Sequence, residues 1–286
     1  MSEDLPPGLF GPGAERPAAA RREGITYALV PGHRPLLLDL HRPRRPWPVP
    51  VVVWIHGGAF LGGDRRYLPD TLAPGSLFRR LNAAGLACAT IDYRLSGEAR
   101  FPAQLDDVRA AVAMLTDRAG ELGLEGRGSG MGGESGGATL AALAALADDR
   151  AAAAVLWYPM TDPLADGVDT PDSPVALLLG GRPSERPELA RQAGAVHQVR
   201  PGAPPFLLMH GADDRQLPPA HSRRLHERMR EAGNSSELRV VPGADHCFEG
   251  AADIDALIGE SVAFLRRHLL PDAAAEEAVA AAVRAG

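Results

Sequence analysis

Ser135 lies in the run GESGG at residues 133–137, which fits the pattern G-x-S-x-G. In this pattern a sharp turn from a strand into a helix exposes the serine hydroxyl, and a Cβ at either flanking glycine would clash in the turn. A helical pattern at residues 136–147 follows at once, and the glycine-rich segment before the motif can supply a short strand. We therefore interpret Ser135 as a nucleophile for acyl chemistry.

A second small-residue motif, HGGAF at residues 56–60, directly follows an apolar run at residues 51–55. Standing alone, it would read equally well as an ordinary tight turn. Coupled to a serine motif about eighty residues later, it indicates a loop whose backbone N–H groups face a substrate carbonyl. We expect the N–H groups of Gly58, Ala59 and Gly136 to hold the oxyanion.

His246 is the histidine best placed to act as a general base. It lies in a loop after a strand-like run at residues 238–241 and before a helical pattern at residues 254–269. The other histidines fall on helical patterns, in the insertion or ahead of the core, and His56 and His210 read as structural members of their turns.

The acid that orients this base should follow a strand between the serine and the histidine. The run at residues 206–209 is such a strand, and both Asp213 and Asp214 come shortly after it. From the residues alone, both aspartates are candidates. Asp245 is a poor one, because neighbouring side chains on one strand or turn point apart.

The elements that must position these residues alternate between strands and helices along the chain. Strand-like runs are expected at residues 25–29, 36–40, 51–55, 87–91, 152–157, 206–209 and 238–241. Helical patterns are expected at residues 102–118, 136–147, 221–232 and 254–269. This alternation predicts an α/β fold with a mostly parallel central sheet and helices on both faces. The site then belongs at the carboxyl ends of the strands.

A chain of 286 residues can form one large domain. Residues 1–24 carry four prolines and are expected to form a loose N-terminal arm, and residues 25–270 the domain. Within the domain, residues 159–204 read as a small cap insertion. The Ala-rich segment 271–286 is expected to form a helical tail.

Composition excludes several other classes of function. All 30 basic residues are arginine, so lysine-dependent chemistry is absent, and the net charge of -6 argues against a nucleic-acid partner. The two cysteines, Cys88 and Cys247, have no metal-ligand spacing, and we expect neither metal nor cofactor. The N-terminus shows no signal-peptide pattern, and the longest apolar run is too short for a bilayer, which predicts a cytoplasmic protein without membrane association. The residue usage is typical of a GC-rich bacterial genome. Monomer and homodimer both stay open.

Beyond these motifs, the chain resembles the hormone-sensitive-lipase-like and ferulic-esterase-like carboxylesterases of the α/β-hydrolase superfamily, including the kynurenine-formamidase-like branch. The resemblance extends from about residue 25 to about residue 270 and rests on further blocks: DYRL at 92–95, FPAQ at 101–104, LGG at 179–181, PPFLL at 204–208 and HG at 210–211. Two residues depart from the family pattern. Gly136 stands where the family usually has alanine, and Cys247 where it usually has glycine.

The resemblance implies an α/β-hydrolase fold and places the acid on Asp214, through the register of the block that begins at His210. It implies a serine hydrolase that cleaves carboxylic esters of small molecules through an acyl-enzyme. The small size of the cap insertion leads us to expect a preference for short acyl chains. Hydrolysis of amides or thioesters, acyl transfer and cyclisation use the same machinery and stay open. A ligand-binding protein without activity on the same fold is the alternative from another class. Phe60 and Phe248, each beside a motif, are expected to wall the substrate pocket.

Overall fold

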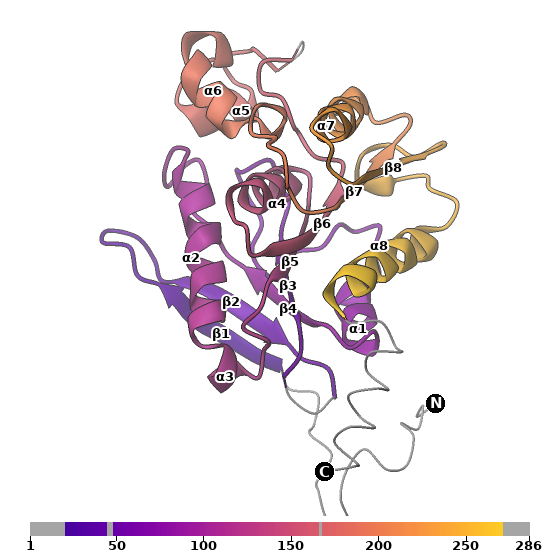
Figure 1. The fold of residues 1–286 in the computed structure, drawn as a ribbon. Coiled ribbons are helices and arrows are strands. Elements are labelled where there is room, and N and C mark those ends of the chain that lie inside the picture. The colour runs from indigo at the N-terminus through magenta and orange to yellow at the C-terminus, as the bar shows by residue number, and fades with distance from the viewer. Residues whose placement is uncertain (1–20, 45–47, 166–167, 271–286) are drawn as a thin grey trace, which may run out of the picture.

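The apolar runs of the chain form the strands of one eight-stranded sheet (Figure 1). The structure is a computed structural model that describes residues 21–44, 48–165 and 168–270. The strands are β1 (Arg21–Ala28), β2 (Leu36–His41), β3 (Val51–Ile55), β4 (Ala87–Ile91), β5 (Ser129–Glu134), β6 (Ala151–Trp157), β7 (Phe206–Gly211) and β8 (Ser236–Val241). They lie in the order β1-β2-β4-β3-β5-β6-β7-β8.

Most neighbouring strands in this sheet are parallel. Only β1 with β2 and β2 with β4 pair antiparallel, whereas every pair from β4 to β8 is parallel. A parallel pair needs a crossover, and helices supply these crossovers on both faces of the sheet. The predicted α/β class with a mostly parallel sheet is confirmed.

Helices cover both faces of the sheet. They are α1 (Ser76–Ala83), α2 (Ala103–Asp117), α3 (Ala119–Leu122), α4 (Gly136–Ala147), α5 (Pro174–Leu179), α6 (Pro187–Ala193), α7 (Ala220–Glu231) and α8 (Ile254–Leu269). Apolar residues of α2, α4 and α7 join one buried cluster, and those of α1 and α8 join another on the opposite face. The sheet therefore has a hydrophobic core on each side, as a parallel sheet requires.

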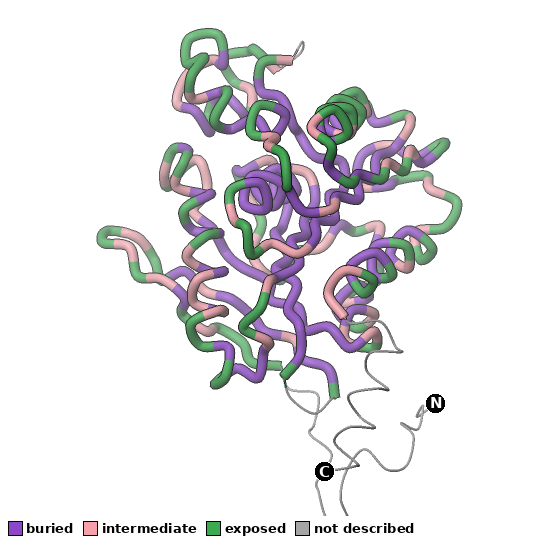
Figure 2. Tube along the Cα trace, viewed as in Figure 1, coloured by how far each residue is buried: buried purple, intermediate pink, exposed green. Residues whose placement is uncertain are grey.

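The helix that follows Ser135 is buried almost throughout. Every residue of α4 except Ala147 is buried, and Figure 2 shows this helix enclosed by other elements. Its composition of alanine, leucine and glycine suits this position, since small side chains allow close approach to β5 and β6 and no polar face has to reach water. A fully enclosed helix gives Ser135 a rigid base.

Several elements differ by one or more residues from the expected boundaries. β1 begins at Arg21, four residues before the expected strand, because the polar residues at its start pair with β2 and the Gly24 N–H donates to Asp39 at 2.8 Å. Residues 1–20 of the expected arm and the tail at 271–286 lie outside the described residues.

The segment between β6 and β7 contains only short helices. These are α5, α6 and the 3₁₀ turns η1 (Pro183–Glu185) and η2 (Ala195–His197), and Figure 1 shows α5 and α6 at one end of the molecule. The carboxylate of Asp162 anchors this segment, since it forms ion pairs with both Arg224 of α7 and His197 of η2.

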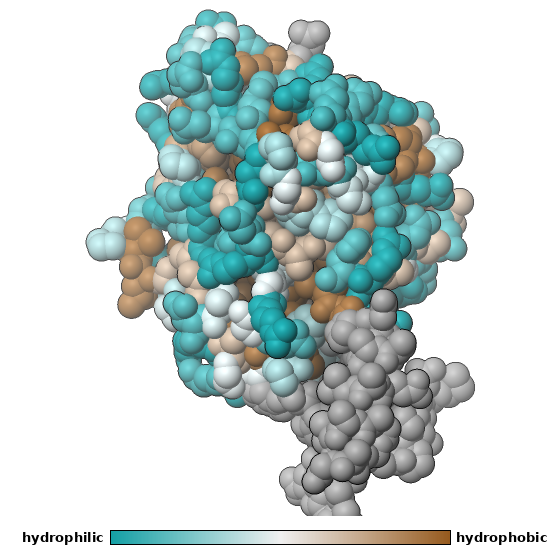
Figure 3. All heavy atoms as spheres, viewed as in Figure 1, coloured by the Kyte–Doolittle hydropathy of each residue, from teal (hydrophilic) through white to brown (hydrophobic). Residues whose placement is uncertain are grey.

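The face of the molecule in Figure 3 is largely hydrophilic. A hydrophobic group stands out at the β1–β2 turn, where Leu29 is 75% exposed. None of the helices in the described ranges combines the length and the apolar character needed to cross a bilayer.

The packing of β5 on β3 predicts the effect of a small substitution. A Cβ on Gly132 would lie 2.5 Å from Cε3 of the buried Trp54, so we expect Gly132→Ala to destabilise the protein by about 1–3 kcal/mol through overpacking. Gly120→Ala is the matched control, because its Cβ would meet no atom within 4 Å. Thermal unfolding of both variants measures the difference, and equal melting temperatures would contradict the packing argument.

Candidate active site

Ser135 occupies the turn between the end of β5 and the start of α4. Its backbone lies at φ 50° and ψ −122°, a conformation that costs free energy for any residue with a side chain. Two hydrogen bonds hold it: the Ser135 N–H donates to the Trp157 carbonyl at 2.9 Å, and the Thr139 N–H donates to the Ser135 carbonyl at 3.1 Å. The turn is thus fixed by β6 on one side and by α4 on the other.

The flanking glycines are required by the close approach of this turn to the end of β3. A Cβ on Gly133 would lie 2.7 Å from the Ile55 carbonyl oxygen, and one on Gly137 would lie 2.2 Å from the same atom. Both distances are far below a normal contact, so the two positions exclude any side chain. The third glycine, Gly136, has more room, since its Cβ would approach the ring of Phe60 at 3.1 Å.

His246 reaches Ser135 from the loop after β8. This loop contains the 3₁₀ turn η3 (His246–Phe248), and the His246 N–H donates to the Asp245 carboxylate at 2.8 Å. The ring Nε2 lies 3.2 Å from Ser135 Oγ, and Nδ1 lies 2.8 Å from Asp214 Oδ2. The structure therefore brings together the three residues that the sequence singled out.

Of the two adjacent aspartates, Asp214 contacts His246. Its carboxylate is buried and also accepts N–H groups of Gln216 and Leu217, whereas Asp213 is exposed. Burial alone would raise the pKa of Asp214, but hydrogen bonds from His210, His246 and the Leu217 N–H outweigh it and hold the pKa well below its ordinary value. Asp214 is therefore an anion at neutral pH.

His210 supports Asp214 and does not compete with His246 for Ser135. Its Nε2 donates to the Leu217 carbonyl at 2.7 Å and lies 3.2 Å from Asp214 Oδ2, while the Ser222 hydroxyl donates to Nδ1 at 2.7 Å. Both ring nitrogens are thereby occupied. His210 is a structural member of its turn, in keeping with the expectation from sequence.

The loop after β3 adopts left-handed backbone conformations at successive residues. Gly58, Ala59 and Phe60 have φ values of 96°, 56° and 64°. Among the described residues, nothing accepts a hydrogen bond from the N–H groups of Gly58, Ala59 or Gly136. This loop passes close to Ser135, since a Cβ on Gly57 would lie 3.4 Å from Ser135 Cβ. Unpartnered N–H groups near a serine nucleophile are the arrangement that an oxyanion needs.

The two phenylalanines expected to wall the substrate pocket are core residues in the structure. Phe60 is 2% exposed and covers Gly136, and Phe248 is 1% exposed. Cys247, at φ 58°, reverses the chain, and the Phe248 ring packs against the rings of Trp157 and Tyr158 at 5.6 and 4.9 Å between centroids. Glycine adopts a positive φ at the least cost, which fits the glycine that the family resemblance leads us to expect at this position.

A buried pair beside the three site residues was not anticipated from sequence. The Glu134 carboxyl, 1% exposed, lies 3.0 Å from the Tyr158 hydroxyl, and the Tyr158 ring lies 4.7 Å from the His246 ring between centroids. Glu134 occupies the variable position of the serine motif, which carries no signal of its own. The one sequence feature that could have indicated this pair is a charged residue at the end of a strand that is expected to be buried.

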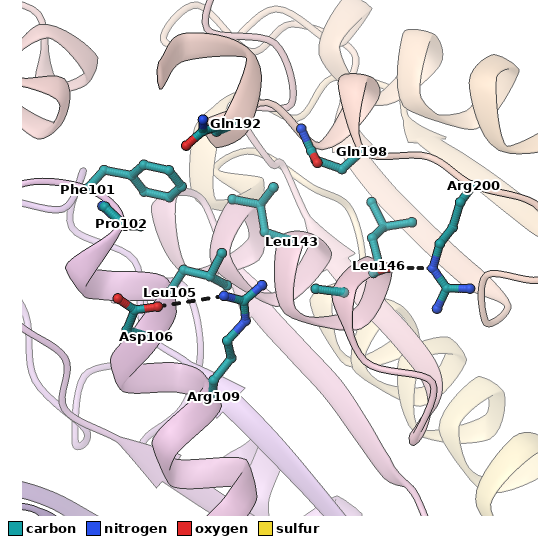
Figure 4. Close-up of a pocket in the computed structure, with 11 residues that line it drawn as sticks. Phe101, Pro102, Leu105, Asp106, Arg109, Leu143, Leu146, Gln192, Gln198 and Arg200 are labelled. Atoms are coloured by element: carbon teal, nitrogen blue, oxygen red, sulfur yellow. Dashed lines mark hydrogen bonds and ion pairs between the residues drawn. The ribbon is translucent and has the colours of Figure 1, made fainter. Parts of the chain in front are cut away.

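Within the described ranges, no three His, Cys, Asp or Glu side chains gather as they would around a metal ion. A separate cavity of about 490 Å³ opens between α2, the C-terminal half of α4 and the α6–η2 segment (Figure 4). It is lined by Phe101, Pro102, Leu105, Asp106, Arg109, Leu143, Leu146, Ala147, Gln192, Gln198 and Arg200. None of the predicted site residues lines it, because it lies at the opposite end of α4 from Ser135.

Comparison with known proteins places this geometry in a family. Residues 38–229 match the family model described as BD-FAE. Esterase LipQ of Mycobacterium tuberculosis is 30% identical over 88% of this chain and 63% of its own length, and Esterase LipC of the same organism is 30% identical over 71% and 54%. The chain thus spans less than two thirds of these curated relatives.

Solved structures share the fold. A truncated carbohydrate esterase from gut microbiota superposes with a TM-score of 0.80 at 22% identity, covering 90% of this chain and 99% of that one. A bacterial heroin esterase superposes with a TM-score of 0.73 at 25% identity, covering 89% and 85%. Together with the family match over more than half of the residues, these likenesses show that the chain has the α/β-hydrolase fold and belongs to the BD-FAE family.

Proposed function

We propose that this protein is a serine carboxylesterase that cleaves esters of small molecules through an acyl-enzyme. The observation that carries the proposal is the continuous contact from Asp214 through His246 to Ser135, at 2.8 and 3.2 Å. Relatives named as esterases, LipQ and LipC among them, support the choice of esters.

In the first step, His246 acts as the general base. Because Asp214 is an anion, it accepts a hydrogen bond from Nδ1–H of His246 and so keeps the proton on Nδ1, and the lone pair of Nε2 then faces the Ser135 hydroxyl. Nε2 takes the hydroxyl proton as Oγ bonds to the acyl carbon. The positive charge that forms on the imidazole is stabilised by Asp214.

The negative charge that develops on the carbonyl oxygen is received by the N–H groups of Gly58, Ala59 and Gly136. Each such donor typically contributes about 10²- to 10³-fold in rate. His246 then gives its proton to the leaving alcohol, and water attacks the acyl-enzyme with His246 again as base. The cycle ends with free carboxylic acid and restored Ser135.

Ser135→Ala is the direct test of the nucleophile. We expect it to abolish hydrolysis of p-nitrophenyl acetate, because no other group in the turn can carry the acyl chain, and to leave the melting temperature nearly unchanged. Activity is measured by p-nitrophenol release and folding by thermal denaturation. Full activity in a folded variant would refute the assignment of Ser135.

The adjacent aspartates offer a matched pair for the acid. Asp214→Asn should lower kcat by about 10⁴-fold, since an amide neither selects the His246 tautomer nor stabilises the imidazolium. Asp213→Asn should have a mild effect, because Asp213 is exposed. Steady-state kinetics of both variants decide between them, and the reverse order of effects would move the acid to Asp213.

Acyl-chain preference tests the expectation that residues 159–204 form a small cap over the site. Because α5 and α6 have six and seven residues, we expect little apolar surface for a long tail and a preference for chains up to about six carbons, with about 0.8 kcal/mol per buried methylene. Values of kcat/KM for acetate to dodecanoate esters give the answer, and a maximum at ten or twelve carbons would contradict it. Thioesters and N-formyl anilines in the same assay separate esters from the other acyl groups.

A further inference from the structure

Glu134 is a buried carboxyl to which the proposed reaction gives no role. It ends β5, immediately before Ser135, and is 1% exposed. No arginine or histidine of the described residues forms an ion pair with it. A carboxylate in such surroundings is costly, so the site must either gain something from its charge or hold it neutral.

The carboxyl of Glu134 touches two other loops of the site. Its Oε1 accepts the Gly57 N–H of the oxyanion loop at 3.4 Å, and a Cβ on Gly57 would lie 3.3 Å from Glu134 Cγ. Its Oε2 lies 3.0 Å from the Tyr158 hydroxyl. Tyr158 in turn packs its ring against that of His246, at 4.7 Å between centroids.

The direction of these hydrogen bonds depends on the proton of Glu134. A neutral carboxyl accepts the Gly57 N–H on one oxygen and donates its own hydrogen from the other to the Tyr158 hydroxyl. An ionised carboxyl would accept from both groups and would leave a buried negative charge without a cation.

We propose that Glu134 is a positioning residue that works as a neutral carboxyl. It fixes the oxyanion loop (residues 56–60) through Gly57 and the loop that contains His246 through Tyr158. This inference rests on the proposed esterase function. The Glu134 side chain then holds both loops in place relative to Ser135, the next residue in the chain. A negative charge here would oppose the oxyanion that Gly58 and Ala59 receive.

The ionisation of the surrounding groups supports this assignment. Burial raises the pKa of Glu134 to about 8, although the hydrogen bonds that the Tyr158 hydroxyl and the Gly57 N–H would give to the ionised carboxylate lower it in part. The titratable groups that sense its charge are Tyr67, Tyr93, Tyr158 and Cys247, and the pKa of each is raised by burial, that of Cys247 to about 11. Burial also lowers the pKa of His56 in the oxyanion loop. These groups therefore stay neutral where Glu134 titrates.

The decisive comparison is Glu134→Gln with Glu134→Ala. Glutamine reproduces a neutral carboxyl, because its carbonyl accepts from Gly57 and its amide donates to Tyr158. We expect the Gln variant to retain kcat within about threefold at about pH 7, and the Ala variant to lose about 10- to 100-fold in kcat with little change in KM. Tyr158→Phe should lower kcat in the same way.

The pH profile supplies a readout that a purely structural role would not change. In the natural protein, kcat should fall as the pH rises through about 8, where Glu134 ionises, and Glu134→Gln should lack this fall. Glu249→Gln is the matched control, since Glu249 is exposed, directly follows the η3 turn that contains His246, and its loss removes an equal charge. This control should keep the natural profile.

Thermal unfolding tests the protonation state without any substrate. The folded protein binds the Glu134 proton more tightly than the unfolded chain, so its melting temperature relative to that of Glu134→Gln should fall as the pH rises from about 4.5 to about 8. A pH-independent difference would overturn the neutral carboxyl. A folded Glu134→Gln variant with as low a kcat as Glu134→Ala would also overturn the neutral carboxyl. A Glu134→Ala variant with the natural kcat would overturn the positioning role. Absence of ester hydrolysis in the natural protein would instead refute the proposed function.

Discussion

The close approach of the β5–α4 turn to the end of β3 is the constraint on which the site depends. Gly133 and Gly137 both face the Ile55 carbonyl at distances that exclude a Cβ. This contact fixes where α4 begins and forces Ser135 into a left-handed conformation, which points its hydroxyl out of the sheet. It also brings the loop after β3 against Glu134, so the nucleophile and the unpartnered N–H groups share one rigid support.

Much of this architecture could be predicted from the sequence because local patterns and tertiary packing agree. α4 and α8 have the predicted boundaries: a glycine pair starts the first, and Asp253 caps the second by accepting the Ala256 N–H. The opposite holds for β5. Its run of glycines and one methionine has little strand preference, and it is a strand because β3 and β6 pair with it on both sides.

The same distinction between local pattern and tertiary packing explains which parts of the site could be predicted from the sequence. Ser135, Asp214 and His246 each follow a strand, where chain order and short motifs are informative. The direction of the Phe248 ring depends instead on the left-handed backbone at Cys247, which no pattern of apolar residues encodes. Likewise, the contact of Glu134 with Tyr158 joins residues 24 positions apart at the ends of adjacent strands, and β-strand register alone brings them together.

Two carboxyl groups of the site have environments that push their pKa values in opposite directions. Both are buried, but Asp214 accepts hydrogen bonds from two histidines and backbone N–H groups, which hold it ionised. Glu134 has one long backbone hydrogen bond and a tyrosine hydroxyl, and burial dominates. The proposed acyl transfer would place a positive charge on His246 and a negative charge on the substrate oxygen. An anion beside the histidine and a neutral carboxyl behind the oxyanion loop match that distribution of charge, whereas exchanging the two ionisation states would oppose it at both ends.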